Sequence, residues 1–530
     1  MPDMPETGKD AHEKNLAEAL ALVLDEFGRD VRAGVQGMQQ LDVLLPKQAH
    51  EAVMDWPLTL KASMWAGRES GADVAAHAAF SLAALQDAGL LSPHGLPPDV
   101  GLGFDATLAR LHAAAHAGSQ AAALALADRF AHGIGVARND QLALHYYSSA
   151  AHMLVTDVEA SLSLGPAFRA LDMRARHMDC GYTTDEERET SPDVLLYEEE
   201  LALRGDPAMV SRQAWRRLMG VGVPRDYRAA LRGFEDAAEM GDVAATYSVG
   251  YMHLQGLGLP GGEKNVTRAR QQFEHARALG LPVAWCGLGS MHWGGQAFDH
   301  NFTSAMELFH LGAEADSPDC YLKIGLMYSM GLGVQTNATR AVEHMEAARK
   351  LGHWRAPFNL GLMYERPHED GAVPQNVTAA LANYRLLAVA RGGWTLAVQG
   401  AADALDGGDE WGALAGMVLA AEQGSDVAAA NAGWMLKRGL GFEGPKRVFM
   451  AARMLERAAR QKHAGSRMEL AQLLLEEEDL GPLRERARAA RAWLREAVRA
   501  RDPEGLTAVA WARQHGLHDW ARNTSRAAEL

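Results

Sequence analysis

The sequence lacks most features that mark nucleic-acid-binding, membrane-spanning or secreted proteins. Its 52 Lys and Arg residues are outnumbered by 67 Asp and Glu residues, and the net charge of -15 argues against nucleic acid, because phosphate binding needs a positive surface. No apolar run approaches the roughly 20 residues of a membrane-spanning helix, so no direct membrane span is expected. Residues 1–15 carry both charge signs and do not resemble a secretory signal.

Aromatic residues and cysteines are scarce. Aromatics make up 7% of the chain although hydrophobic residues reach 48%, much of it alanine, which favours closely packed helices and predicts an all-α fold. The three cysteines, Cys180, Cys286 and Cys320, allow at most one internal disulfide and show no zinc-pair spacing. Buried free thiols are the favoured interpretation, and a bridge between Cys286 and Cys320 stays open.

Catalytic signatures are missing as well. The sequence contains no P-loop, no G-x-S-x-G and no H-E-x-x-H motif. His112 and His116 are four residues apart on one predicted helical face, but no Cys or carboxylate nearby completes a metal site. His253 and His292 share a repeat column, which packing explains. We therefore predict no enzyme activity, no catalytic residue, no metal and no cofactor.

What the chain does contain is a repeat. An Asn-x-Thr triplet recurs in steps of 36, 36 and 39 residues, at Asn265, Asn301, Asn337 and Asn376. A glycine column precedes the triplets, and a second glycine follows six residues after its first three members. The first column is Gly250, Gly289, Gly325 and Gly361, and the second is Gly256, Gly295 and Gly331.

Each unit reads as a helical hairpin. After each asparagine an alanine and a large apolar residue follow four positions apart, as in Ala269 and Phe273, which is the spacing of one helical face. The first glycine column is predicted to admit the large residue of the neighbouring helix, and the second to end the first helix at positive φ. Because one hairpin cannot bury its own apolar face, stacked hairpins are expected to share a continuous core.

Fainter copies extend the repeat to about ten to twelve units, with two irregularities. Residues 152–200 interrupt the rhythm and are predicted to form a long loop, and residues 396–424 a shortened hairpin without the glycine turn. The predicted division is a charged tail and first helix at 1–45, N-terminal repeats at 46–151, an irregular loop and linker at 152–204, middle repeats at 205–395, and C-terminal repeats with capping helices at 396–530.

Two explanations compete for the Asn-x-Thr triplets. Asparagine at this position can cap the second helix, as can Asp105, Asn139 and Asp226 in the same column, and each cap is worth about 1 kcal/mol. Capping does not require the threonine, whereas N-glycosylation does. We therefore predict N-glycosylation at the four repeat asparagines and at Asn523.

An arginine-rich stretch begins at Arg484. Its seven arginines face two glutamates before Asp502. A solvated face of a late helix is favoured over the binding of an anionic partner.

The repeat resembles the Sel-1-like repeat, a relative of the tetratricopeptide repeat, over roughly residues 70–510. The copy "GLMYSMGLGVQTNATRAVEHMEAARKLGH", which begins at Gly325, is close to that family's pattern. The resemblance implies a right-handed α-solenoid with a concave binding surface.

The two irregular stretches narrow the resemblance further. The break after "ALHYYSSAAHMLVTDVEASLSLGP" and the stretch "ARGGWTLAVQGAADALDGGDEWGALAGMVLAAEQG" from Ala390 are similar to the Sel-1/Hrd adaptors of the endoplasmic-reticulum ubiquitin ligase. That resemblance implies a non-enzymatic adaptor for misfolded glycoproteins (ERAD), in the endoplasmic reticulum lumen or associated with its membrane. The implied partners are a membrane RING ubiquitin ligase, glycan-reading lectins and misfolded clients, with a homo-oligomer left open. The alternative is a soluble, cytoplasmic or organellar scaffold for signalling or complex assembly.

Overall fold

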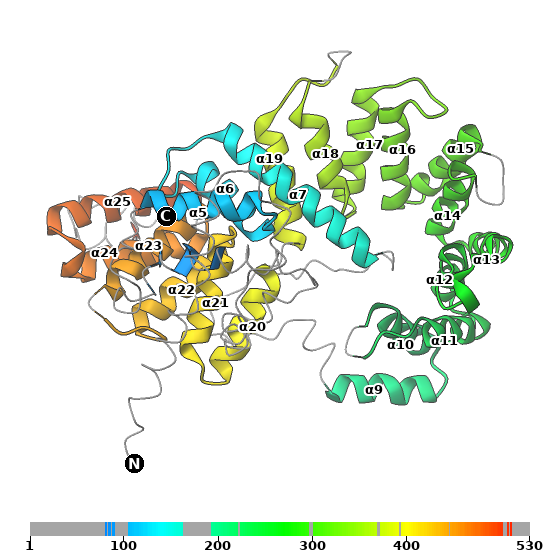
Figure 1. Ribbon diagram of the computed structural model, residues 1–530, viewed down its shortest axis with the longest axis horizontal. Coiled ribbons are helices and arrows are strands. Elements are labelled where there is room, and N and C mark those ends of the chain that lie inside the picture. Colours follow the sequence, from blue (N-terminus) through cyan, green and yellow to red (C-terminus); the bar gives the residue numbers. More distant parts are fainter. Residues whose placement is uncertain are drawn as a thin grey trace, which may run out of the picture. The chain divides into compact units, whose positions relative to one another are not determined.

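The computed structural model describes residues 80–90, 104–162, 192–501 and 506–510 (Figure 1). Within these ranges it leaves out 82, 86, 89, 221–222, 296–299, 368–371, 392–393, 445 and 508. Every element in the described ranges is a helix, and the predicted all-α fold is confirmed. The helices fall into two compact units, each treated separately below. Unit 1 holds the described residues of 1–150 and 391–530, and unit 2 those of 151–171 and 183–390.

Unit 2 is a stack of helical hairpins. Helix α7 (Asp140–Leu162) enters it from unit 1, and the helices that follow are α9 (Pro192–Leu203), α10 (Pro207–Met219), α11 (Tyr227–Glu239), α12 (Val243–Gln255), η3 (Pro260–Gly262), α13 (Val266–Ala278), α14 (Pro282–Trp293), α15 (Phe302–Glu314), α16 (Pro318–Met330), α17 (Ala338–Lys350), α18 (Ala356–Glu365) and α19 (Val377–Arg391). From α10 on, even-numbered helices are the first helices of their hairpins and odd-numbered helices the second. Each hairpin packs on the next, as α11 does on α12 and α13 on α14.

The second helices start on the predicted side-chain caps. The Oδ1 atom of Asn265 accepts a hydrogen bond from the Arg268 N–H at 3.0 Å, and Asn337 accepts one from the Arg340 N–H at 2.9 Å. Asn301, Asn376 and Asp226 cap in the same way. The cap also fixes the turn, because the Asn265 N–H donates back to the His253 carbonyl of the preceding helix at 2.9 Å.

The glycine column interlocks the two helices of a hairpin, as predicted. A Cβ atom added to Gly289 would lie 2.5 Å from Cε1 of Phe309, and one added to Gly250 would lie 2.8 Å from Cε1 of Phe273. Gly325 meets Met345 and Gly361 meets Tyr384 in the same way. All four large side chains are buried, and each fills the space that a side chain on the facing glycine would occupy.

The second glycine column ends the first helices. Gly256 has φ of 79° and Gly331 φ of 70°, and each terminates its helix in the left-handed region that glycine tolerates best. Gly295 has φ of 62° but lies one residue past Gly294, the C-cap residue of α14.

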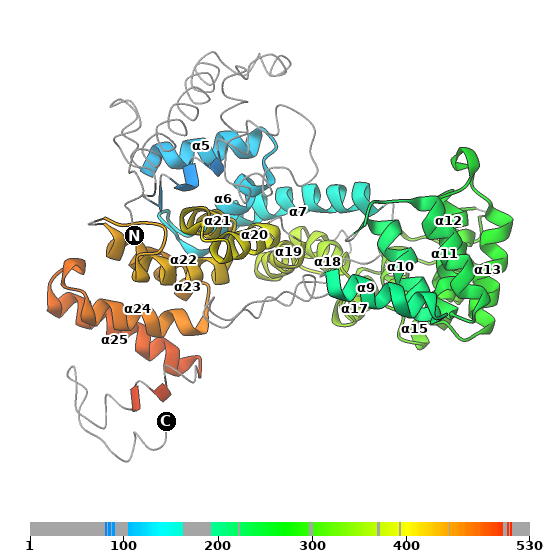
Figure 2. The same cartoon turned by 90° about the horizontal axis from the view of Figure 1, so that it is seen from below.

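Unit 1 combines the two ends of the described chain. Its helices are α5 (Phe104–His116), α6 (Gln120–His132), the first part of α7, α20 (Trp394–Asp406), α21 (Glu410–Glu422), α22 (Asp426–Arg438), α23 (Arg447–Arg460), α24 (Ala464–Glu476), η4 (Glu478–Leu480) and α25 (Leu483–Arg499), with further helical residues between 80 and 88. Helix α6 packs beside α21 (Figure 2), although nearly 300 residues separate the paired Arg129 and Glu422.

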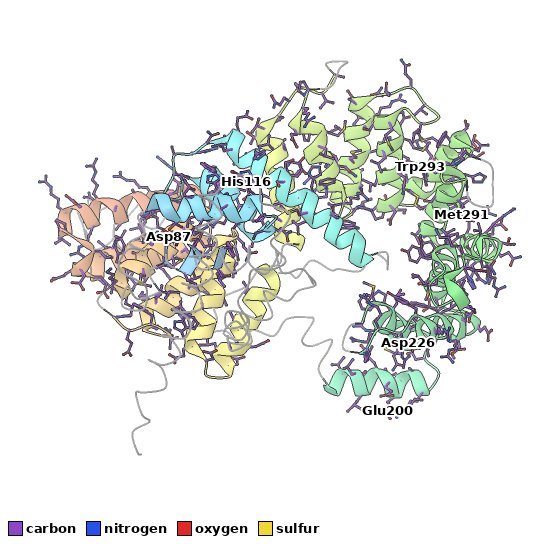
Figure 3. All side chains as sticks on the ribbon, viewed as in Figure 1. Asp87, His116, Glu200, Asp226, Met291 and Trp293 are labelled. Atoms are coloured by element: carbon purple, nitrogen blue, oxygen red, sulfur yellow. A yellow bond between two sulfur atoms is a disulfide. The ribbon has the colours of Figure 1, made fainter. Side chains whose placement is uncertain are left out.

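A buried ion cluster joins these distant segments. Arg129, with none of its side chain exposed, lies 2.9 Å from Glu422 Oε2 and 2.7 Å from Asp87 Oδ2. Asp87 is labelled in Figure 3. Arg457 pairs with Glu422 and with Asp128, 3.0 Å away. Burial opposes the charge of Arg129, yet Glu422 and Asp87 outweigh it and raise its pKa. The cluster therefore holds buried charges that are compensated by one another and by neighbouring groups such as Arg453 and Gln461.

Three details differ from the predictions. The segment predicted as an irregular loop and linker, 152–204, begins and ends in helix, because α7 continues to Leu162 and α9 spans Pro192–Leu203; residues 163–191 lie outside the described residues. Asp105 is not a cap residue, since α5 already begins at Phe104.

The five-part division of the chain stays a prediction. The shortened hairpin is present as α20 and α21, joined by residues 407–409.

The favoured free thiols are the third correction. Cys286 and Cys320 form a disulfide, with their Cα atoms 5.4 Å apart. Both cysteines are buried and sit on first helices of successive hairpins, α14 and α16, which contact each other directly. The bond links two adjacent repeats across α15.

Candidate protein-binding surface

The first helices of unit 2 form the inner side of its stack. Helix α12 contacts α14, and α14 contacts α16, so first helices approach one another across the intervening second helices. In Figure 1 the first helices α12 and α14 lie nearer the inside of the unit 2 arc than their partners α13 and α15. A curved solenoid presents its inner helices as an extended binding surface.

Four positions along the first helices are at least partly accessible, except for Gly287 on α14 and Asn359 on α18, which are buried. The four positions lie six and two residues before the column glycine and one and five residues after it, which places them on one helical stripe. We call the larger side chains at these positions the inner face. It comprises Arg212, Trp215 and Met219 on α10, Tyr251 on α12, Asp319, Lys323, Leu326 and Met330 on α16, Arg355 just before α18, and Leu362 on α18.

The residue types of the inner face suit the binding of polypeptides. Aromatic, methionine and arginine side chains are enriched in protein interfaces, and Trp215, Tyr251 and Met330 represent the first two kinds. Met330 is 51% exposed and Leu362 is 40% exposed, so apolar surface is accessible at two successive hairpins. Isolated exposed apolar residues are common, but their recurrence on one stripe defines a surface.

A polar cluster lies in the middle of this face. His353, three residues before the start of α18, places Nε2 3.4 Å from Oδ1 of Asp319 on α16. The His353 Nδ1 accepts a hydrogen bond from the Arg355 N–H at 3.1 Å, so Nε2 carries the proton that points to Asp319. Lys323 lies above the Trp293 ring, 5.2 Å from its centroid. The cluster therefore joins three successive hairpins.

The pKa values of this cluster reflect both burial and nearby charges. Burial raises the pKa of Asp319, but the hydrogen bond and charge of His353 and the charge of Lys323 outweigh it, so the pKa is lowered. Burial lowers the pKa of Lys323. Burial raises the pKa of Tyr247 on α12, and the Asp319 carboxylate adds to the rise although α12 and α16 are two hairpins apart.

The predicted glycosylation sites lie on another part of the hairpins, at the start of the second helices. Asn265, Asn301 and Asn376 are exposed and Asn337 is half-buried, while the threonines two residues later are all exposed. The cap uses Oδ1, so Nδ2, the atom that carries a glycan, takes no part in it. Asn523 lies outside the described residues.

The histidines considered for metal binding have other contacts. His112 hydrogen-bonds through Nδ1 to the Tyr146 hydroxyl at 2.6 Å and packs against Phe130, and burial, together with His116, lowers its pKa. His253 is buried beside its turn, as packing predicts, and His292 is half-buried. Across the described part of the chain, no cluster of three or more His, Cys, Asp or Glu side chains has the arrangement to hold a metal ion.

The inner face was not found from the sequence. Its residues vary from hairpin to hairpin, so they form no column of one residue type. The four positions are recognised as one surface only once the first helices are known to lie on the inner side of the stack. The signal was available in the offsets from the glycine column. Within the described residues, no helix combines the length and apolar character needed to cross a membrane.

Stacked hairpins with glycine interlocks, glycine helix ends and side-chain caps define a helical-repeat solenoid. The Sel1 repeat family matches seven segments of the chain, at 120–153, 214–242, 243–280, 283–317, 318–353, 355–388 and 426–463. The chain therefore contains Sel1 repeats in these segments.

Individual relatives are distant. A stretch of 126 residues is 29% identical to the alginate biosynthesis protein AlgK of Pseudomonas syringae pv. tomato, covering 24% of this chain and 25% of AlgK. The chain therefore spans only a quarter of that relative's length.

Among solved structures, the chain is similar to c5321, a protective antigen of uropathogenic Escherichia coli with an SLR fold, at 20% identity, 89% and 90% coverage and a TM-score of 0.29. It is also similar to a Sel1 repeat protein from Oxalobacter formigenes, at 20% identity, 84% and 92% coverage and a TM-score of 0.27. Whole chains do not superpose at these scores, so the two likenesses carry no information on function.

Proposed function

We propose that this protein is a non-enzymatic scaffold that binds other polypeptides along the inner face of unit 2. The observation that carries the proposal is the recurrence of accessible aromatic, apolar and charged side chains on one stripe of the first helices α10, α12, α16 and α18. Such a scaffold acts by proximity, because it raises the effective concentration of the molecules that it holds.

The inner face suits an unfolded or extended polypeptide. Leu326, Met330 and Leu362 offer apolar contacts, while Lys323, Arg355 and Asp319 can pair with charges or with backbone groups of the bound chain. Alternating apolar and polar contacts suit segments that a folded protein would bury. This chemistry supports clients that are misfolded or not yet assembled.

The finer proposal is that the protein recruits misfolded glycoproteins to a membrane RING ubiquitin ligase in the endoplasmic reticulum. It rests on the resemblance to Sel-1/Hrd adaptors, to which the shortened hairpin α20–α21 adds support because it falls in the stretch that carries that resemblance. The Cys286–Cys320 disulfide favours an oxidising compartment, and the exposed Asn-x-Thr triplets favour one with glycan transfer. Lectins that read glycans are the further partners proposed.

A second candidate is an assembly scaffold outside the endoplasmic reticulum. The match to AlgK, named for alginate biosynthesis in a bacterium, favours it. A bacterial cell envelope is also oxidising, so the disulfide fits both candidates, and the cytosol fits less well. Glycan transfer to the repeat asparagines is expected only for the first candidate.

Binding is tested with reduced, carboxymethylated α-lactalbumin, a permanently unfolded polypeptide, labelled for fluorescence anisotropy. Replacing Leu326, Met330 and Leu362 by serine is expected to raise the Kd by about tenfold or more, because each removed apolar contact contributes on the order of 0.5–1 kcal/mol. The matched control replaces three exposed leucines of the second helices and their ends, Leu279, Leu311 and Leu351. Equal effects of the two triple variants, both checked for unchanged helicity, would reject the inner face as the binding surface.

The compartment is tested by glycosidase digestion of the protein from its native cells. We expect digestion to increase its gel mobility, and the shift to shrink when Thr267, Thr303, Thr339 and Thr378 are replaced by alanine. Threonine variants are chosen because the Asn Oδ1 atoms keep the helix caps. A mobility that digestion leaves unchanged would reject the endoplasmic-reticulum proposal and leave the scaffold proposal intact.

A further inference from the structure

Helix α25 in unit 1 carries a row of arginines along one face. Going along the helix, the members are spaced by four, three, four and four residues, so their side chains fall on a single stripe. The row consists of Arg484, Arg488, Arg491, Arg495 and Arg499, of which all but the half-buried Arg491 are exposed. At a rise of 1.5 Å per residue the row is about 22 Å long.

The other side of α25 is anchored, which holds the row in place. Ala490, Leu494 and Ala497 are buried, with Ala490 and Leu494 in a core that includes Ala471 of α24. Arg486, on the same anchored side, is buried and donates from Nη1 to the Leu474 carbonyl at 3.0 Å and from Nε to the Gly481 carbonyl at 2.7 Å. This arginine completes the end of α24, whereas the five-residue row points away from the core.

The row differs from the charged faces of other second helices. Arg270 on α13 pairs with Glu274 at 2.8 Å, and Arg460 on α23 pairs with Glu456 at 2.8 Å. On α25, Arg499 lies 3.5 Å from Glu496, a longer distance than in those pairs, and both side chains are mainly exposed. Five like charges at this spacing repel one another, so the row lowers the stability of the isolated helix. An acidic partner would remove this repulsion.

Two features limit the kind of partner. The whole chain has a net charge of -15, which repels nucleic acid and anionic membranes at long range. An acidic run, Glu476 to Asp479, directly precedes α25, so a broad anionic surface laid along the helix would meet repulsion at that end. A narrow acidic helix carries less charge than nucleic acid or a membrane surface, and by following only the row it stays clear of the acidic run.

We propose that this arginine row docks an acidic helix of a partner protein, with carboxylates repeated at three- and four-residue spacing. All basic residues of α25 are arginine, whose planar guanidinium pairs with carboxylates through two parallel hydrogen bonds. The site lies in unit 1 and does not depend on the inner face of unit 2. It gives the scaffold a second surface of different chemistry.

The probe is a fluorescein-labelled helical peptide whose glutamates repeat the spacing of the row, compared with the same peptide carrying glutamine. The full chain is expected to bind the glutamate peptide and not the glutamine peptide, with weakening between low and physiological salt. Replacing Arg484, Arg488 and Arg495 by glutamine should raise the Kd about tenfold, as expected for the loss of three exposed ion pairs.

The control removes the same charge elsewhere. Arg228, Arg232 and Arg268 are exposed on α11 and α13, where acidic residues are interleaved. Their replacement by glutamine should change the Kd less than twofold, and thermal unfolding should confirm that both variants fold. Equal weakening in both variants would overturn the proposal, as would binding to phosphatidylglycerol vesicles or to duplex DNA that exceeds binding to the peptide.

Discussion

Units 1 and 2 are built from the same hairpin, yet they are held together differently. In unit 2 every stabilising contact described above joins a hairpin to itself or to a near neighbour, through the glycine interlocks, the caps and one disulfide. In unit 1 a buried ion cluster joins residues that lie 293 and 329 positions apart. Local repetition therefore explains unit 2, whereas unit 1 needs a contact that no repeat period specifies.

The difference has an energetic meaning. A solenoid of nearest-neighbour contacts tolerates the loss of one contact, because the remaining interfaces still stack. A buried cluster of charges has no such tolerance, since removing one member leaves its partners charged and without water. Unit 1 should accordingly respond to single substitutions more sharply than unit 2.

The largest effect is expected for Arg129→Met in unit 1. The change leaves Glu422 and Asp87 buried without their main counter-charge, which should destabilise unit 1 by about 3–5 kcal/mol. Hydrogen exchange should show lost protection in α6 and α21 and unchanged protection in α12 to α17. The control Arg138→Met removes an exposed pair with Asp140 and should change neither unit. Full protection of α6 in Arg129→Met would contradict the cluster's role.

The disulfide should give the next largest effect, confined to unit 2. Replacing both Cys286 and Cys320 by alanine should lower the free energy of unfolding by about 3 kcal/mol, because the bond closes a loop that the unfolded chain would otherwise leave open. Urea unfolding of the parent protein should shift to lower midpoint when a reductant is added. The double variant should not respond to reductant, and coincident parent curves with and without it would refute the bond.

The glycine interlock should give a smaller loss. Gly289→Ala forces a Cβ against the rigid Phe309 ring, which should cost about 1–3 kcal/mol of unfolding free energy. Phe309→Leu in the same chain should recover part of the loss, and a double-mutant cycle in thermal or urea unfolding measures that coupling. Additive effects of the two substitutions would mean that the ring does not fill the glycine's space.

The smallest effect is a pH dependence that differs between the units. Burial, with the charge of Arg268, lowers the pKa of His253 below 6.5, so the unfolded state binds the proton more readily and unit 2 loses stability as pH falls below 6.5. Asp87 in unit 1 has a lowered pKa despite its burial, so its contribution persists above 3.8 and is lost only as pH falls further. Burial also lowers the pKa of His112 in unit 1, but in unit 2 it lowers the pKa values of three histidines, His253, His292 and His344. Hydrogen exchange at decreasing pH should therefore show unit 2 weakening more steeply than unit 1.

His253→Gln gives the matched test of that dependence. The variant should reduce the loss of unit 2 stability between about pH 6.5 and 5. The reason is that glutamine does not titrate, whereas His253 must lose its proton when the chain folds. An unchanged slope would assign the dependence to other groups, such as His292 and His344, whose pKa values burial also lowers.

Much of unit 2 could be predicted because its signals are local. An asparagine before a helix and a glycine facing a large residue each report on groups within about one repeat, and Asn337 and Gly325 behave as those signals indicated. The disulfide could not be settled in advance, because a separation of 34 residues permits the bond without requiring it. The helical ends of the 152–204 segment were missed because they lack the glycine turn.

The ion cluster of unit 1 was out of reach of the sequence. Arg129, Glu422 and Arg457 are ordinary helical residues that fit a solvated face equally well, and no spacing connects them. The inner face could not be predicted for another reason, because Trp215, Tyr251 and Lys323 are three different residue types and form no column in the repeat. A binding surface is defined by where side chains gather, which periodicity alone does not reveal.

Photo-cross-linking tests the proposed scaffold role most directly. A photo-reactive phenylalanine at position 326, on the inner face, and another at position 311, on a second helix, are each exposed to carboxymethylated α-lactalbumin. The account predicts strong cross-links from position 326 and background labelling from position 311. Equal labelling from the two positions, or labelling only from position 311, would contradict it.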